Sequence, residues 1–595
     1  MPLRVWLPLL GNLDNQGLDD LIVTNNGATI DTAGKLGKCY CFNNTAAIVT
    51  HLNVSPFVEH FSFCGWVKFT STTSAQYIFH LGGATWQSKY ALSEDYSGTI
   101  VYYIDGTENR TTLSTASTLN QWVHYAYTYD GSTVRIYVNG ELGYSVAKSS
   151  ASFSYSDNLS FGARVNNSAG TAFAYGMQTG YLNDVRLYDN CLSAKAIKEI
   201  AKGLVCHYTL GDKPCDNILT NSTGYNGTTD WGGVISTATE NGIPYLISQR
   251  TNTTSTSRTF VSHSAITSYV SSWSAGDKFT ISGYYRVPSS ETYAVSANLF
   301  IRWTFADSSF SDTGFSTPSA STVVKDTWIR FEYTYTVPAN YTDGAVNFYL
   351  SAFSQGLSTV HWKYVKLEKG DRATPWLPNS SDAEYTTMGY NSTTVYDCSG
   401  YNYHGAINTT MSVSSNTSRY SVSTNFNGTD NCITIPFNTM CPTNIFTMNI
   451  WFYKDALGSK NYETLVGGPS GFEMDTRAGT ATTLSLYMAS TRGSTLYSPL
   501  EFNMWNMITM VRDGTNEYYY VNGDLKKTIT AKSMPTGTYF IGAWNTKTSQ
   551  NYYGLMSDFR LYSTCLSADN ILELYHTGAT IDRSGNMYAY EFSEV

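Results

Sequence analysis

One stretch of the sequence occurs twice. Residues 119–147 read LNQWVHYAYTYDGSTVRIYVNGELGYSVA, and residues 502–531 read FNMWNMITMVRDGTNEYYYVNGDLKKTITA. Each copy holds a Trp, an alternating run, an Asp-Gly pair, a second run ending in Tyr-Val-Asn-Gly, and a third run. Asp-Gly and Asn-Gly between alternating apolar and polar residues are strong hairpin signals, because both residues tolerate the positive φ of a tight turn. The sequence therefore predicts a three-stranded antiparallel meander, encoded twice.

The landmarks around the two meanders also match. Trp66 in FCGWVKF corresponds to Trp451 in NIWFYK, and the segments that begin NDVRLYDNCLSA at Asn183 and SDFRLYSTCLSA at Ser557 agree almost residue for residue. The Trp of each meander precedes the Asn of its Asn-Gly turn by 17 residues in both copies. Fixed order and spacing of this kind indicate two homologous β domains.

These motifs resemble the laminin-G-like branch of the concanavalin A-like lectin/glucanase superfamily. The closing form, LSAxxIxEL with a short helix, resembles copies found in structural proteins of bacteriophages of gut Firmicutes. The resemblance implies an all-β chain with two concanavalin A-like antiparallel β-sandwiches of jelly-roll type, and it suggests a phage virion protein as the setting.

The spacing breaks once, which indicates an insertion. GLVCHYTLGD, which begins at Gly203, repeats the opening strand of the chain, but the Trp that should follow appears far later than in the first copy. The intervening text opens DNILTNSTGYNGTTDW and closes KLEKGDRATPW, which resembles carbohydrate-binding-module-like jelly rolls of phage tail proteins. We therefore expect four parts. These are a first sandwich (1–203), a discontinuous second sandwich (204–215 and 380–580), an inserted jelly roll (216–379) and a tail (581–595).

Composition narrows the classes of partner. The net charge is −9 and Lys and Arg are scattered, so no phosphate-binding surface is indicated and nucleic acid is not expected as a partner. No run approaches the roughly 20 apolar residues that span a bilayer, so no membrane insertion is expected. The first residues lack the features of a signal peptide. We expect synthesis in the host cytoplasm and a place in the virion.

Catalysis is not expected. Glucanases of this superfamily use a strand with E-x-D-x-x-E, which places two carboxylates about 5 to 5.5 Å apart. The nearest match is Glu473 and Asp475, but Ala478 stands at the third position. Glu94 and Asp95 in the first domain are adjacent and should point to opposite faces of a strand. We expect these carboxylates to be solvated strand-end groups, no catalytic residues, and no enzyme activity.

Calcium is the one cofactor for which the sequence offers candidates. Laminin-G-like domains often bind one Ca²⁺ through Asp and Asn oxygens at the rim, which suit a hard cation. The candidates lie near Asp130, Asp184, Asp513 and Asp558, and all four also have explanations in turns or strand packing.

Sugar binding needs only an aromatic face and a few amides or carboxylates on loops. The candidate ligand-binding residues are aromatic and lie in loop-like text: Trp86, Trp231, Trp544, Tyr552 and Tyr553. Four other tryptophans recur at matched strand positions and are predicted to be core: Trp66, Trp122, Trp451 and Trp505.

The sequence therefore favours a phage tail-fibre, baseplate or capsid-fibre protein that binds host-surface or mucin glycans without catalysis. Other virion proteins are expected as partners, and fibre proteins suggest a homo-oligomer, a trimer by analogy. Two alternatives stay open at this point. One is a purely structural virion protein that mediates protein contacts, and the other is a polysaccharide depolymerase.

Overall fold

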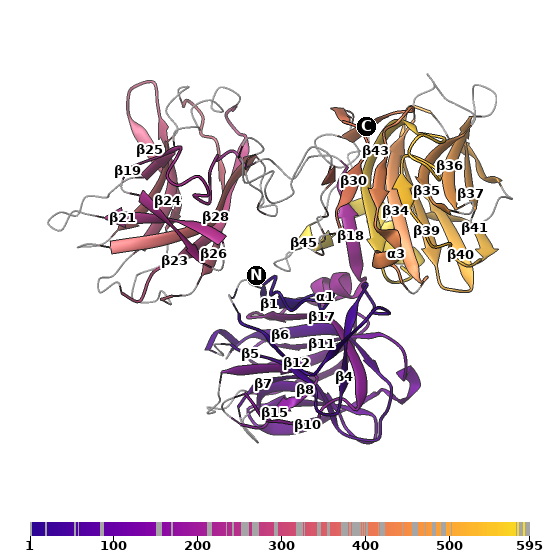
Figure 1. Cartoon of the computed structure of the whole chain (residues 1–595), viewed down its shortest axis with the longest axis horizontal. Coiled ribbons are helices and arrows are strands. Elements are labelled where there is room, and N and C mark those ends of the chain that lie inside the picture. The colour runs from indigo at the N-terminus through magenta and orange to yellow at the C-terminus, as the bar shows by residue number, and fades with distance from the viewer. Residues whose placement is uncertain are drawn as a thin grey trace. The chain divides into compact units, whose positions relative to one another are not determined.

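The architecture comes from a computed structural model of the chain (Figure 1). It describes residues 3–588 except 18, 20, 53–54, 58, 84–87, 150–156, 168–169, 211–216, 234, 241–242, 251–260, 264–272, 291–295, 317–324, 327, 342–346, 354–357, 370–375, 377–378, 380–381, 383–393, 396, 398, 400, 402, 415, 417–422, 443, 455–461, 470–471, 479–483, 490–494, 501, 579 and 582–586. The chain divides into two compact units, one formed by Met1–Asp212 with Thr393–Val595 and the other by Lys213–Ser392.

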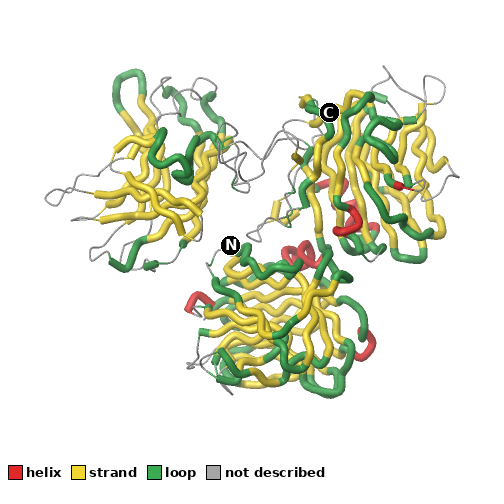
Figure 2. Tube along the Cα trace, viewed as in Figure 1, coloured by secondary structure: helices red, strands yellow, loops and turns green. Residues whose placement is uncertain are grey.

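The predicted all-β class is confirmed. Strands make up most of the described chain (Figure 2). The pairs between named strands are antiparallel. The helices are short: η1 (Ser55–Phe57), η2 (Ala116–Thr118), α1 (Ala194–Ala201), α3 (Phe437–Met440) and α4 (Ala568–Thr577). None of the helices in the described part of the chain has the length and apolar character needed to cross a bilayer.

The first sandwich consists of two large sheets. One has the order β13 (Glu141–Ala147), β12 (Thr133–Val138), β11 (Val123–Tyr129), β6 (Phe61–Phe69), β17 (Thr179–Tyr188), β4 (Cys39–Asn43) and β3 (Thr29–Asp31), with β1 (Leu3–Leu7) also paired to β17. The other has the order β10 (Thr107–Ser114), β9 (Thr99–Ile104), β8 (Ser88–Glu94), β7 (Gln76–Gly82), β14 (Asn158–Phe161), β5 (Ala47–His51) and β2 (Thr24–Asn26). A small sheet pairs β15 (Arg164–Val165) with β16 (Phe173–Ala174).

The second sandwich repeats this plan. Its first sheet has the order β31 (Ser412–Ser414), β32 (Ser423–Asn427), β43 (Tyr553–Tyr562), β34 (Phe446–Tyr453), β39 (Trp505–Arg512), β40 (Asn516–Val521) and β41 (Asp524–Thr530). Its other sheet has the order β29 (Thr394–Val395), β30 (Gly405–Ile407), β33 (Ile433–Ile435), β42 (Tyr539–Ile541), β35 (Glu463–Gly467), β36 (Glu473–Ala478), β37 (Leu484–Ala489) and β38 (Thr495–Leu500). The tail pairs β44 (Thr580–Ile581) with β45 (Met587–Tyr588).

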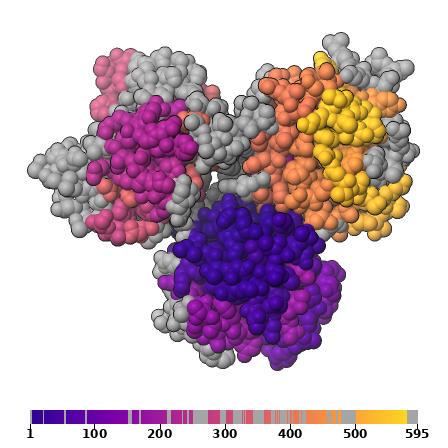
Figure 3. Space-filling model, in the orientation of Figure 1, coloured from indigo at the N-terminus to yellow at the C-terminus, as the bar shows by residue number. Residues whose placement is uncertain are grey.

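One strand of the second sandwich comes from far earlier in the chain. The strand β18 (Leu204–Tyr208) pairs with β43, and in Figure 1 it lies in magenta among orange and yellow strands. It occupies the place that β1 occupies beside β17 in the first sandwich. In Figure 3 early and late residues of the first sandwich likewise lie side by side on its surface. In both sandwiches an early strand therefore joins the last long strand.

The unit formed by Lys213–Ser392 contains two five-stranded sheets. One has the order β19 (Trp231–Gly233), β22 (Val261–His263), β27 (Asn347–Phe353), β24 (Ser296–Thr304) and β25 (Phe310–Ser316). The other has the order β20 (Ile235–Glu240), β21 (Ile243–Arg250), β28 (Ser358–Lys369), β23 (Lys278–Arg286) and β26 (Ile329–Thr336). Asn217 ties the two ends of this unit together, because its backbone oxygen accepts from Asn379 Nδ2 at 2.6 Å and its side-chain oxygen accepts from the Leu367 amide at 3.1 Å.

The repeated meanders form as predicted and carry the same turn chemistry. β11–β12–β13 and β39–β40–β41 are consecutive antiparallel strands. Asn139 and Asn522 take left-handed φ values of 49° and 50° before a glycine. The Asn139 side-chain oxygen accepts from the His124 amide at 2.9 Å, and that of Asn522 accepts from the Met507 amide at 2.8 Å. Asn therefore fixes the turn and also holds the start of the first strand of each meander, β11 or β39.

Alternation along the strands of the first sandwich gives its two faces. Phe63 and Val67 of β6 lie in the core between the sheets, and Cys64 and Trp66 lie on the opposite face. That outer face is covered by α1, whose first turn is capped by the Ser193 hydroxyl accepting from the Ala196 amide. The apolar cluster of this outer face continues without a break into the interior of the second sandwich.

A prediction follows from the turn that contacts α1. Gly140 has a φ of +87°, and a Cβ built on it would lie 3.1 Å from Ala201 Cβ. Gly131 has a similar φ of +89°, but the nearest atom to its Cβ would be 3.5 Å away, which is an ordinary contact. Gly131→Ala should lose only the roughly 1 to 2 kcal/mol cost of a left-handed alanine, whereas Gly140→Ala should lose measurably more. Urea unfolding of both variants measures the difference, and equal losses would contradict the packing of this turn on α1.

Candidate ligand-binding site

The carboxylates that most resemble a glucanase pair are buried. Glu473, Asp475 and Glu94 are at most 4% exposed, and Asp95 is 5% exposed. The expectation that they are solvated strand-end groups is therefore wrong. Asp95 accepts hydrogen bonds from the backbone amides of its own turn and pairs with Arg110. These side chains are part of the packing between strands.

Glu94 has both of its carboxyl oxygens engaged by hydrogen-bond donors. Gln76 Nε2 donates to one of its oxygens at 2.7 Å, and the Thr115 hydroxyl donates to the other. Burial raises the pKa of Glu94 to about 7, against the opposing effect of these two donors. A raised pKa is a mark of catalytic acids, but both oxygens here are engaged by neighbouring strands and the side chain is fully buried. The geometry fits an internal polar network.

The four aspartates proposed for Ca²⁺ serve two repeated structural purposes. Asp130 and Asp513 accept from backbone amides two and three residues ahead, so they close their Asp-Gly turns. Asp184 and Asp558 are buried and pair with Arg186 and Arg560.

These four side chains do not converge on one point. Within the described ranges no group of three or more His, Cys, Asp or Glu side chains is placed to hold a metal ion. A calcium ion bound at these aspartates would have to displace hydrogen bonds and ion pairs that they already make.

The five aromatic residues predicted to bind a ligand differ in how deeply they are buried. Trp86 lies outside the described residues. Trp231 is only 7% exposed, and its indole nitrogen donates to the Asn221 carbonyl at 2.9 Å. Tyr552 is fully buried, and its hydroxyl donates to the Tyr453 carbonyl at 2.9 Å. The prediction that Trp231 and Tyr552 present a ring to a sugar is therefore wrong, because each ring faces a core and each polar atom is engaged.

Trp544 and Tyr553 stay at the surface. Trp544 is half-buried, on the connection between β42 and β43. Tyr553 is 36% exposed, and the Lys454 ammonium lies 5.1 Å from its ring centre. They remain candidates for contact with a ligand, and the prediction for them stands untested.

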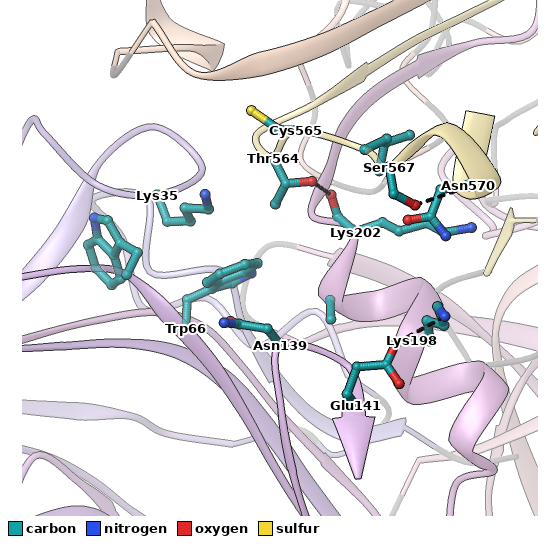
Figure 4. Close-up of a pocket in the computed structure, with 13 residues that line it drawn as sticks. Lys35, Trp66, Asn139, Glu141, Lys198, Lys202, Thr564, Cys565, Ser567 and Asn570 are labelled. Carbon is teal, nitrogen blue, oxygen red and sulfur yellow. Dashed lines mark hydrogen bonds and ion pairs between the residues drawn. The ribbon is translucent and has the colours of Figure 1, made fainter. Parts of the chain in front are cut away.

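A pocket of about 390 Å³ lies where the two sandwiches meet (Figure 4). The second sandwich contributes Thr564, Cys565, Leu566, Ser567 and Asn570, and the first contributes Lys35, Trp66, Trp122, Asn139, Glu141, Lys198, Ala201 and Lys202. In Figure 4, Thr564, Cys565 and Ser567 lie above, with Trp66, Asn139 and Glu141 below. We call this the junction pocket.

The walls of the junction pocket are held by hydrogen bonds across the link between the sandwiches. The Thr564 hydroxyl donates to the Lys202 carbonyl at 2.7 Å, and the Ser563 amide donates to the Gly203 carbonyl at 2.9 Å. Lys202 also pairs with Glu573 of α4 at 3.1 Å. These bonds join the end of the first sandwich to the last strand and helix of the second.

A difference between the two repeats opens this pocket. In the second sandwich the indole of Trp451 stacks on Tyr575 of α4, with ring centres 5.5 Å apart and planes 8° apart. The aligned helix of the first sandwich has Ala201 where the second has Tyr575. The corresponding indole, Trp66, has the Lys35 ammonium 4.7 Å from its ring centre in place of a stacked tyrosine.

The cations of the junction pocket differ in their partners. Lys198 pairs with Glu141 at 3.0 Å, and Lys202 pairs with Glu199 and Glu573. Burial alone would lower the pKa of Lys202, but these carboxylates raise it above its usual value. Among the described residues no carboxylate pairs with Lys35, and burial lowers the pKa of its ammonium to about 8.

The comparison with family models agrees with this architecture. The model described as the concanavalin A-like lectin/glucanases superfamily matches residues 42–198 and 427–572, together about half of the chain. The chain belongs to the concanavalin A-like lectin/glucanases superfamily. The match covers both predicted copies, so the recognition of two laminin-G-like domains is confirmed. The comparison with curated proteins found no match.

Several solved structures are similar to parts of the chain. Domain 4 of an arabinanase from Geobacillus stearothermophilus, in complex with arabinotriose, is 17% identical over 30% of this chain and 92% of that one, with a TM-score of 0.25. A pentraxin from Limulus polyphemus is 15% identical over 31% and 82%, with a TM-score of 0.22. The binding domain of botulinum neurotoxin serotype D is 11% identical over 61% and 97%, with a TM-score of 0.28. At these scores the likenesses carry no argument about function.

The junction pocket is not among the sites that the sequence predicts. Trp66 and Trp122 are predicted to be core residues, and Trp66 is only 3% exposed. Both residues nevertheless line the pocket. The aligned repeats contain a signal that could have pointed to the pocket. Ala201 stands where the second repeat has Tyr575, although the tryptophan of this face is matched in both repeats. The lysine that lies over Trp66 comes from residue 35, outside the repeated motif, and its position needed the fold.

The pKa of Glu94 predicts a pH dependence of stability. The folded chain keeps a proton on Glu94 up to about pH 7, whereas an unfolded chain releases it near 4.5. Between these values the folded state binds more protons, so this group makes the free energy of unfolding fall as pH rises from about 4.5 to 7. Glu94→Gln, which keeps the side chain neutral, should flatten that part of the profile in denaturant titrations. An unchanged profile would show that Glu94 titrates normally.

The lowered pKa of Lys35 predicts one lysine NMR resonance with an unusually low titration midpoint. In protein whose lysines carry ¹³C-methyl groups, one resonance should titrate with a midpoint near pH 8, well below the ordinary value of about 10.4. That resonance should disappear in Lys35→Met and persist in Lys195→Met, which removes an exposed lysine of α1. If all lysine resonances titrate above pH 10, Lys35 is solvated and does not lie against Trp66 as described.

Proposed function

We propose that this protein is a non-catalytic carbohydrate-binding component of a bacteriophage virion, a tail-fibre, baseplate or capsid-fibre protein that holds glycans of the host surface or of mucin. The observation that carries the binding part is the pair of concanavalin A-like lectin/glucanase domains. The virion setting is supported by the resemblance of the repeat endings, such as the segment that begins at Ser557, to phage structural proteins.

Binding is favoured over hydrolysis by the state of the carboxylates. A retaining glycosidase needs two carboxyl groups about 5 to 5.5 Å apart on either side of a bound sugar, and an inverting one needs about 6.5 to 9.5 Å. Both groups must reach the substrate. Glu473, Asp475 and Glu94 are buried inside sheets, and Ala478 supplies no third carboxylate. The junction pocket is instead lined by indole, amide and ammonium groups, with Glu141 as its carboxylate.

Repeated domains would act together on a polyvalent surface. Weak sites linked on one particle raise the overall avidity by orders of magnitude without any tight individual contact. Two lectin-like sandwiches per chain, multiplied by the copies on a virion, suit reversible attachment to dense glycans.

The test is a glycan array probed with the full chain, combined with a reducing-end assay on the glycans that bind. The chain should be retained by host-surface or mucin glycans, and it should release no reducing ends because the carboxylates that most resemble a glucanase pair, Glu473 and Asp475, are buried. Release that Glu473→Gln abolishes would establish a depolymerase. Retention by no glycan, together with stable assembly onto particles, would establish a purely structural protein.

A further inference from the structure

We propose that the junction pocket binds an acidic sugar, a pyranose that carries a carboxylate such as a uronic acid. This rests on the proposed glycan-binding function and assigns it a site and a chemical class. The first argument is the difference between the repeats beside Trp66, which lines the junction pocket although its side chain is only 3% exposed. In the second repeat Tyr575 stacks on the matched indole, and in the first repeat the smaller Ala201 lines the junction pocket together with Trp66. An aromatic ring facing a cavity is a surface on which the apolar side of a pyranose can pack.

The polar atoms around the junction pocket favour an acceptor-rich ligand. The indole nitrogen of Trp66 is buried and has no hydrogen-bond partner among the described residues. A buried donor without a partner costs free energy that a ligand oxygen can recover. Asn139 and Asn570 add amide groups to the lining. Glu141 is the one carboxylate of the lining, and it is already paired with Lys198.

The positive charge of Lys35 favours an anionic ligand in the junction pocket. Lys198 and Lys202 are neutralised by carboxylates within the structure. Lys35 has no carboxylate partner among the described residues; its side chain is half-buried, and its ammonium lies over the ring of Trp66. A carboxylate that enters here gains a charge-assisted hydrogen bond of the stronger kind. The ammonium lies over the indole ring, 4.7 Å from its centre, so a carboxylate that reaches Lys35 places the rest of its sugar next to Trp66.

The size of the junction pocket fits this class of ligand. Its volume of about 390 Å³ lies at the lower end of the roughly 300 to 1,000 Å³ range of small-molecule sites. That is room for one or two sugar rings, with the rest of a chain outside. Both sandwiches contribute to the lining, so the site exists only where the two repeats meet.

The experiment is titration calorimetry of the full chain with two ligands that differ only in the acid, glucuronic acid and glucose. Glucuronic acid should bind at least tenfold more tightly than glucose. Lys35→Met, which keeps most of the apolar stem, should weaken glucuronic acid binding at least tenfold. Ala201→Tyr, which copies the second repeat into the first, should fill the pocket and abolish binding. Lys195→Met is the matched control and should bind as the unaltered chain does.

The outcomes separate this inference from the proposed function. If the chain is retained on a glycan array but glucuronic acid does not bind, or Lys35→Met binds it normally, the junction pocket is not the site while the glycan-binding function stands. Equal affinity for glucose and glucuronic acid, or equal affinity for inorganic sulfate, would overturn the acidic-sugar assignment. If no glycan is retained and no sugar binds, the proposed function fails together with this inference. Thermal unfolding of each variant checks that Ala201→Tyr remains folded.

Discussion

The structure of the larger unit depends on one shared apolar cluster. The outer face of the first sandwich, the strand that follows α1 and the interior of the second sandwich belong to a continuous set of buried residues. At its centre Trp6 packs edge-on against Tyr401 at 5.5 Å, and Arg186 donates to the Tyr401 hydroxyl at 3.0 Å. Because Asp184 receives both Trp6 Nε1 and Arg186, the ionic and aromatic contacts hold one another in place. Trp66, which lines the junction pocket, belongs to the same cluster.

Duplication supplied two similar sandwiches, and small changes gave them different roles. Asp184 with Arg186 and Asp558 with Arg560 form the same buried pair in both copies. In the first copy that arginine reaches across to Tyr401, whereas in the second it reaches the Gly578 carbonyl after α4. The change from Tyr575 to Ala201 belongs to the same pattern. In the second sandwich Tyr575 of α4 stacks on Trp451. In the first sandwich the matched Trp66 and Ala201 line the junction pocket instead.

Local chemistry explains what the sequence could predict. Asn139-Gly140 and Asn522-Gly523 require left-handed turns, and the alternating runs around them require strands, so the meanders and the all-β class follow directly. The family could be inferred because its landmarks lie within such local motifs. Boundaries of an insertion can likewise be proposed from spacing alone.

Burial was harder to predict because it depends on distant partners. Trp231 stands in loop-like text, but its indole finds the Asn221 carbonyl and the core of the smaller unit. Glu94 has the sequence context of a strand end, yet Gln76 and Thr115 from other segments engage both its oxygens. Lys35 and Trp66 are 31 positions apart and meet only when the sandwich forms. Polar and aromatic residues in short motifs therefore predict the strands and turns of the fold more reliably than they predict which side chains line a binding site.

The most direct measurement is a crystal structure of the full chain soaked with glucuronic acid. We expect a pyranose ring next to the indole of Trp66, with the carboxylate within hydrogen-bond distance of Lys35 Nζ and Ala201 beside the ring. Density for the sugar at the surface around Trp544 and Tyr553, with the junction pocket empty, would contradict it.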